Sequence, residues 1–116
     1  MTLDGQSERN SVPDLTAALE QLWKRFLPEI EERVSILDAA ARACAAGNLP
    51  QEQREAAHAA AHKLAGTLGT FSLSRGTELA REFEQLCAGK DTCSGDQGGR
   101  LSTLAAEIRT IIAGRS

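Results

Sequence analysis

The chain has 116 residues, about the size of one domain, and its formal net charge of −3 comes from intermixed acids and bases, without the basic block that nucleic-acid binding needs. Because 41% of the residues are hydrophobic but only 3% are aromatic, the core must consist mainly of aliphatic side chains, which favours helices over a β-sheet. No apolar run reaches the roughly 20 residues of a membrane span, and Met1 to Gly5 do not begin a secretion signal, so we expect a cytoplasmic protein with no membrane partner.

The N-terminal residues 1–11 are polar and have no periodicity. They cannot bury enough apolar surface to offset the entropy lost on ordering, so we expect a flexible tail there. The domain itself should span residues 12–114. From Pro13 to Phe26 apolar residues recur every three or four positions, which predicts a first helix.

Pro28 interrupts this pattern because proline has no backbone N–H to donate. Either the first helix ends near Phe26, or a longer helix kinks at the proline. The apolar stripe resumes at Ile30 and stops at Gly47, a residue typical of a helix C-terminus. Asn48 is then the expected cap of the following helix.

Three further amphipathic helices are predicted over residues 51–69, 74–88 and 101–113. They are separated by a break at residues 70–73, with Ser72 or Ser74 as the cap, and by a flexible glycine-rich loop at residues 89–99. Short connections between amphipathic helices favour an antiparallel arrangement. The predicted fold is therefore all-α, an antiparallel four-helix bundle with an additional short or kinked N-terminal helix.

The three cysteines have spacings that match no disulfide framework, zinc site or redox motif. Two of them, Cys44 and Cys87, fall on apolar stripes. We therefore expect these two as small core residues rather than as disulfide partners.

His62 lies within the helix predicted over residues 51–69. The apolar face of this helix consists of Ala57, Ala61, Leu64 and Leu68. On a helical wheel the mean direction of that face lies about 130° from His62, so the imidazole should point away from the core. His58, Gly66 and Gly69 fall within about 40° of the same direction. The histidine therefore stands on a strip with little side-chain bulk after it.

Each glycine inside a helix costs about 0.5–1 kcal/mol relative to alanine, so two of them beside an exposed histidine need a reason. A bare helical turn would let a partner's active site reach the imidazole. We therefore predict a docking surface formed by His58, Gly66, Gly69 and Thr70. Two alternatives remain. The glycines could serve close packing of a neighbouring helix, or His58 and His62, four residues apart, could bind a metal ion, although no third ligand is fixed by the sequence.

The run His62-Lys63-Leu64-Ala65-Gly66 resembles the phosphorylation motif His-x-Leu-Lys-Gly of histidine phosphotransfer (HPt) domains. The similarity extends over residues 62–71 and 74–84, and loosely over residues 26–37. The resemblance implies a phosphorelay protein in which His62 is the phosphoacceptor. A neutral imidazole nitrogen is a suitable nucleophile for this reaction. The implied partners are a response-regulator receiver domain and a sensor or hybrid histidine kinase.

The resemblance also implies a phosphocarrier rather than an enzyme, since the sequence contains no kinase motif. No cofactor is expected in the chain, because Mg²⁺ belongs to the receiver partner. The family often has lysine three residues after the histidine, where this sequence has Ala65. Lys63, about 100° around the helix from His62, is the candidate to neutralise the phosphoryl group instead. The alternative function is a helical adaptor or metal-binding bundle without phosphoryl chemistry.

Overall fold

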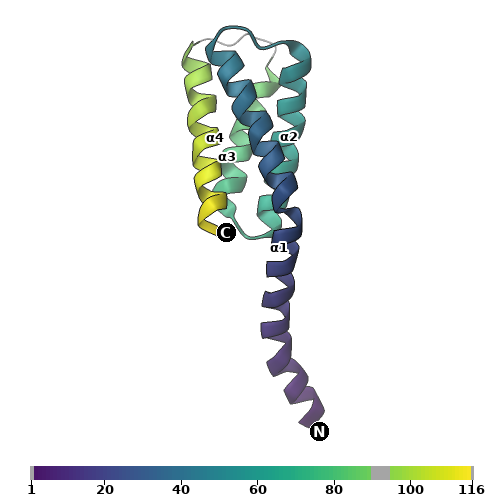
Figure 1. Ribbon diagram of the computed structural model, residues 1–116. Helices are drawn as coiled ribbons and strands as arrows, with labels where there is room; N and C mark the ends of the chain where they lie inside the picture. Colours follow the sequence, from purple (N-terminus) through teal and green to yellow (C-terminus); the bar gives the residue numbers. More distant parts are fainter. Residues whose placement is uncertain (1, 90–94, 116) are drawn as a thin grey trace.

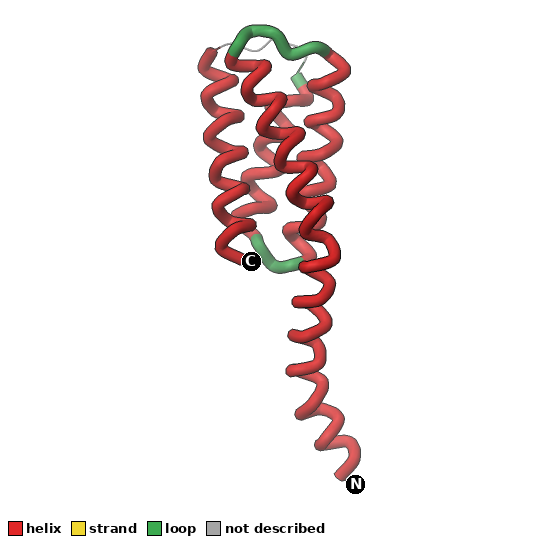
Figure 2. The backbone as a smooth tube through the Cα atoms, viewed as in Figure 1, coloured by secondary structure: helices red, strands yellow, loops and turns green. Residues whose placement is uncertain are grey.

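The computed structural model describes residues 2–89 and 95–115, and these residues form four α-helices and no strand. The helices are α1 (Thr2–Ala45), α2 (Gln51–Thr70), α3 (Ser74–Ala88) and α4 (Gly95–Arg115). Figure 1 shows that successive helices run in opposite directions, and each packs against the two neighbours that precede and follow it around the bundle. The connection between α1 and α2 and that between α2 and α3 lie at opposite ends of the bundle (Figure 2). The predicted all-α antiparallel four-helix bundle is confirmed.

The core of the bundle is apolar, and no polar or charged side chain is buried within the described part of the chain. Its largest members, two or more from each helix, include Ile30, Leu37, Leu64, Leu68, Leu79, Phe83, Leu104 and Ile108. Burial of each such side chain contributes about 1.5–3 kcal/mol. This core fixes which face of each helix points outward. None of the described helices is long and apolar enough to span a bilayer.

Helix α1 passes through Pro28 without a break. Trp23 before the proline, and Ile30 and Val34 after it, are all buried and recur at helical spacing. Their combined burial outweighs the roughly 3 kcal/mol that a proline costs inside a helix. Of the two alternatives for Pro28, the structure therefore contains the long helix.

In the structure α1 already begins at Thr2, within the segment 1–11 for which a flexible tail is predicted; the flexibility of this segment stays a prediction. Figure 1 shows this N-terminal part of α1 projecting beyond the other helices. Each residue added to an existing helix forms one further backbone hydrogen bond. The free-energy cost of extending a helix is therefore far smaller than the cost of nucleating a new one. Two residues of the predicted apolar stripe do not reach the core: Leu15 and Leu19 are 62% and 37% exposed.

Helix α4 begins at Gly95, inside the loop predicted over residues 89–99, of which residues 90–94 lie outside the described part of the chain. From the sequence pattern, the glycines of this segment were expected to break the helix. Gly98 has a different role, because a Cβ added to it would lie 2.6 Å from the Cα of Ala45 in α1. This glycine permits the close approach of the two helices.

The helix ends follow the predictions only in part. Gly47 has a positive φ of 78° just after α1, as expected for a terminating glycine. The predicted cap Asn48 is wrong, because the N-cap of α2 is Pro50, without a side-chain hydrogen bond. The predicted serine caps of α3 are also wrong. Leu73 holds the N-cap position, and Ser72 instead adopts a φ of 60° in the turn between α2 and α3.

Cys44 and Cys87 are both buried, as expected. Cys87 is free, and burial raises the pKa of its thiol to about 11, so it stays protonated at neutral pH and acts as a core residue. Cys44 is disulfide-bonded, which corrects the expectation that it forms no disulfide. Spacing along the chain cannot reveal which cysteines the fold brings together.

Gly98→Ala should destabilise the bundle, whereas Gly99→Ala should stabilise it. The new Cβ at position 98 would meet the backbone of Ala45 at 2.6 Å, and such overpacking costs about 1–3 kcal/mol, more than the roughly 0.5–1 kcal/mol gained by removing a helical glycine. At Gly99 no described atom lies within 4 Å of the added Cβ, so only the gain remains. Urea unfolding followed by circular dichroism measures both effects, and equal midpoints for the two variants would contradict the close contact.

Candidate functional site

The side chain of His62 points away from the core. The buried residues of α2 are Ala57, Ala60, Ala61, Leu64, Ala65 and Leu68. The His62 side chain, on the opposite face, is 72% exposed. The small alanines bring α2 close to its neighbours while leaving the outer face open to solvent. The orientation predicted from the helical wheel is therefore confirmed.

Glu84 of α3 holds the His62 ring from one side. The Nδ1 atom of His62 lies 3.0 Å from Oε2 of Glu84, whose side chain is 22% exposed. An ionised carboxylate can only accept a hydrogen bond, so Nδ1 must be the donor and carry the ring proton. The second nitrogen, Nε2, then keeps its lone pair. The arrangement selects one tautomer of the imidazole and leaves a nucleophilic nitrogen available.

The pairing of His62 with Glu84 follows from the antiparallel register of α2 and α3. One step toward the C-terminus of α2 corresponds to one step toward the N-terminus of α3. Gly69 lies seven residues after His62, and Thr77 lies seven residues before Glu84. These two residues face each other, because a Cβ on Gly69 would be 3.5 Å from the Thr77 hydroxyl oxygen. The same hydroxyl donates to the carbonyl of Ala65 at 3.0 Å. The register is thus fixed over two turns.

An open pocket of about 410 Å³, here called the His62 pocket, lies between α2 and α3. The residues that matter for its chemistry are His58, His62, Ala65 and Gly66 from α2, and Arg81 and Glu84 from α3. It therefore joins the exposed nucleophile, the carboxylate that orients it and an arginine at one place. From the sequence alone, Arg75, Arg81 and Glu84 could border the docking surface, but charged residues at such spacings more often form a plain solvated face, so none of them was selected. Counting outward from the turn between α2 and α3 would have placed Glu84 opposite His62.

The two glycines of the predicted docking surface have room beside them. A Cβ added to Gly66 meets no described atom within 4 Å, and one added to Gly69 makes only an ordinary contact. Thr70, at the end of this strip, is exposed and its hydroxyl donates to the carbonyl of Gly66 at 3.1 Å. Close packing of a neighbouring helix therefore does not explain Gly66. The glycine that does contact α2 closely is Gly76, where an added Cβ would lie 3.0 Å from Leu68.

The other two predicted site residues, His58 and Lys63, lie in different surroundings. His58 lines the His62 pocket, and its Nε2 is 3.7 Å from the same Glu84 oxygen that contacts His62. Lys63 is exposed, but it does not line the pocket. Within the described chain, no group of three or more His, Cys, Asp or Glu side chains is placed to hold a metal ion.

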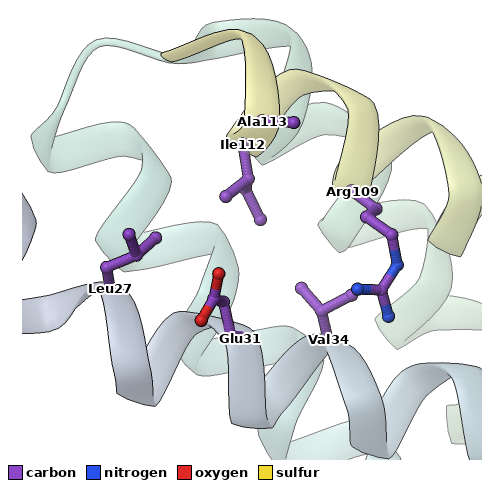
Figure 3. A pocket seen from close by; sticks show the side chains of 6 residues that line it. All are labelled: Leu27, Glu31, Val34, Arg109, Ile112 and Ala113. Atoms are coloured by element: carbon purple, nitrogen blue, oxygen red, sulfur yellow. The ribbon is translucent and has the colours of Figure 1, made fainter. Parts of the chain in front are cut away.

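A second pocket, of about 380 Å³, lies between α1 and α4 (Figure 3). Its walls are mainly apolar, from Leu27, Val34 and Ile112, with Glu31 and Arg109 beside them. Arg109 already pairs with Asp38. No histidine, cysteine, serine or lysine is among the residues that line this pocket. The chemistry suited to group transfer is therefore found at the His62 pocket.

Comparison with known proteins identifies the family of this chain. The sequence model of the Hpt domain family matches residues 12–114. The chain is similar to Protein RcaC of Microchaete diplosiphon, with 33% identity over 97 residues that make up 83% of this chain and 15% of that protein. The chain thus spans about 15% of the length of this curated relative. No solved structure matches the chain significantly. From the match over most of its length, the chain belongs to the Hpt domain family, the histidine phosphotransfer domains of phosphorelays.

Proposed function

We propose that His62 is the phosphoacceptor of this Hpt domain, receiving a phosphoryl group from the aspartate of a receiver domain, or from a histidine kinase, and passing it to another receiver. The single observation that carries the proposal is the hydrogen bond from His62 Nδ1 to Glu84 at 3.0 Å on a side chain that is 72% exposed. It leaves Nε2 both unprotonated and accessible. His58, the chain's other histidine, is the less exposed of the two, at 40%.

The proposed step is an exchange between two acceptor atoms. The lone pair of His62 Nε2 forms a bond to phosphorus while the bond between phosphorus and the aspartate oxygen breaks, and the aspartate leaves as a carboxylate with the electron pair. The ring becomes positively charged and keeps its proton on Nδ1. The Glu84 carboxylate, 3.0 Å away, stabilises that charge. Reversal of the same step returns the phosphoryl group to a receiver.

In this proposal the chain is a phosphocarrier and not an enzyme in its own right. It supplies the nucleophile, while the receiver supplies its own acidic residues and Mg²⁺ to stabilise the phosphoryl group in transfer. The receiver would dock on the strip formed by His58, Gly66, Gly69 and Thr70. Exposed backbone at Gly66, one turn after His62, lets a second protein approach the imidazole closely.

His62→Gln should abolish phosphorylation of the chain. Incubation with a receiver domain charged by acetyl phosphate should label the wild-type protein with an acid-labile, base-stable phosphate, because the nitrogen–phosphorus bond has this stability pattern. The variant should carry none, since an amide nitrogen is no nucleophile. His58→Gln serves as the matched control for the acceptor atom. Because His58 belongs to the docking strip, this variant should slow the labelling, but it should not abolish it. Labelling of His62→Gln at the wild-type level would contradict the proposal.

Gly66→Leu should separate docking from chemistry. The added side chain enters open space, where no described atom lies within 4 Å of its Cβ, so the fold should tolerate it. Transfer from a phosphorylated receiver should fall by about tenfold or more, because a clash in the interface obstructs the large partner. Phosphorylation by phosphoramidate, a small donor, should change less than about twofold.

The control for this experiment is Gly99→Leu, on α4, which has no contact with α2 and has equal room for a side chain. It should transfer at the wild-type rate. Equal losses with both donors in Gly66→Leu would show that the glycine serves the chemistry or the fold rather than docking.

Glu84→Gln should slow phosphorylation of His62 by phosphoramidate several-fold, while Glu78→Gln, on the same helix but outside the His62 pocket, should not. The amide oxygen can still accept the Nδ1 hydrogen bond but no longer carries the charge that stabilises the phosphorylated ring. The rate of phosphohistidine formation, followed by phosphorus NMR, measures the effect. An unchanged rate in Glu84→Gln would refute the charge-stabilising role.

A further inference from the structure

The lysine that the family's motif places beside the phosphoacceptor is absent from the His62 pocket. Ala65 occupies the position where the motif has lysine, and its side chain lines the pocket. Phosphorylation would bring a strongly negative group next to the carboxylate of Glu84. The ring between these two negative groups carries one positive charge, which does not balance a phosphoryl group and a carboxylate together. A further positive charge, from another residue of the chain or from the partner, would therefore stabilise the phosphohistidine.

The register of α2 and α3 places Arg81 at this position. Ala65 lies three residues after His62, and Arg81 lies three residues before Glu84, so the two face each other in the same register that pairs His62 with Glu84. Three residues correspond to about 4.5 Å along a helix axis. Along the helix axes, the backbone of Arg81 therefore lies at the same level as position 65, where the family motif has its lysine. The small side chain of Ala65 leaves space for the guanidinium of Arg81.

Within the described part of the chain, the guanidinium of Arg81 has no ion-pair partner. Its side chain is exposed and forms no hydrogen bond or ion pair with the described residues, whereas Arg75 and Arg100 near it on α3 and α4 are paired with Glu78 and Glu82 respectively. Of the residues that line the His62 pocket, Arg81 is the one with a fixed positive charge. Lys63 is not among the residues that line the pocket.

We propose that Arg81 binds the phosphoryl group on His62, taking the role of the absent lysine from the neighbouring helix. The inference rests on the proposed function of His62 and adds to it the residue that neutralises the phosphohistidine. A guanidinium presents several N–H donors in a plane and binds phosphoryl oxygens in pairs. In the family motif the positive charge comes from position 65 on α2. In this chain it would come from position 81 on α3 and act on the same phosphoryl group.

The experiment uses phosphoramidate as the donor, so that no receiver is needed. Arg81→Gln should reduce the second-order rate of His62 phosphorylation by about tenfold, and Arg81→Lys should recover a substantial part of it. Lys63→Gln is the matched control, because it removes an exposed positive charge next to the histidine in sequence. Its rate of His62 phosphorylation should stay within about twofold of wild type. Circular dichroism of each variant shows whether the bundle is intact.

The decisive variant restores the charge on the other helix. Ala65→Lys combined with Arg81→Gln should return the rate to near the wild-type value, which a merely structural role of Arg81 would not produce. A second measurement follows the side-chain Nε–H signal of Arg81 by NMR. It should shift when His62 is phosphorylated, whereas the signal of Arg75 should not.

The outcomes separate this inference from the function on which it rests. A wild-type protein that acquires no phosphohistidine overturns the proposed function together with the inference. A wild-type protein that is phosphorylated normally, with Arg81→Gln unaffected or Lys63→Gln carrying the loss, overturns the inference alone. An Arg81 signal that does not respond to phosphorylation also overturns it.

Discussion

The hydrogen bond between His62 and Glu84 connects the fold to its chemistry. It depends on the antiparallel register of α2 and α3, in which each residue along one helix has a fixed opposite on the other. The register places a carboxylate beside Nδ1, and the carboxylate in turn determines which ring nitrogen is free to react. A shift of α3 by a single residue would rotate Glu84 by about 100° around its helix and remove the contact.

The apolar core keeps this register while leaving the reactive face bare. Small alanines on the inner face of α2 bring it close to α3, and large side chains from all four helices fill the interior. Glycines serve two opposite purposes in the same bundle. Gly98 allows two helices to touch, whereas Gly66 faces open space, so its lack of a side chain can benefit only something that comes from outside. The site is thus closely packed on its inner side and accessible to a partner on its outer side.

The sequence predicted what depends on one helix and missed what depends on two. The outward direction of His62 follows from the spacing of apolar residues along α2 alone. Glu84 was not selected, because along α3 alone it resembles any charged residue of a solvated face, and its role arises only when α3 lies against α2. The early start of α4 was missed for the same reason, since Gly98 indicates a loop unless the contact with α1 is known. The passage of α1 through Pro28 was left as one of two alternatives, because burial on both sides decides it.

The central claim is that Glu84 fixes the proton of His62 on Nδ1 and so makes Nε2 the reactive atom. Long-range proton–nitrogen NMR of the imidazole ring tests it directly, because the technique distinguishes the two ring nitrogens and reports which one carries the proton or the phosphoryl group. The structure predicts Nδ1–H in the neutral, unphosphorylated protein and phosphorus bonded to Nε2 after treatment with phosphoramidate. A neutral ring with its proton on Nε2, or a phosphoryl group on Nδ1, would contradict the account.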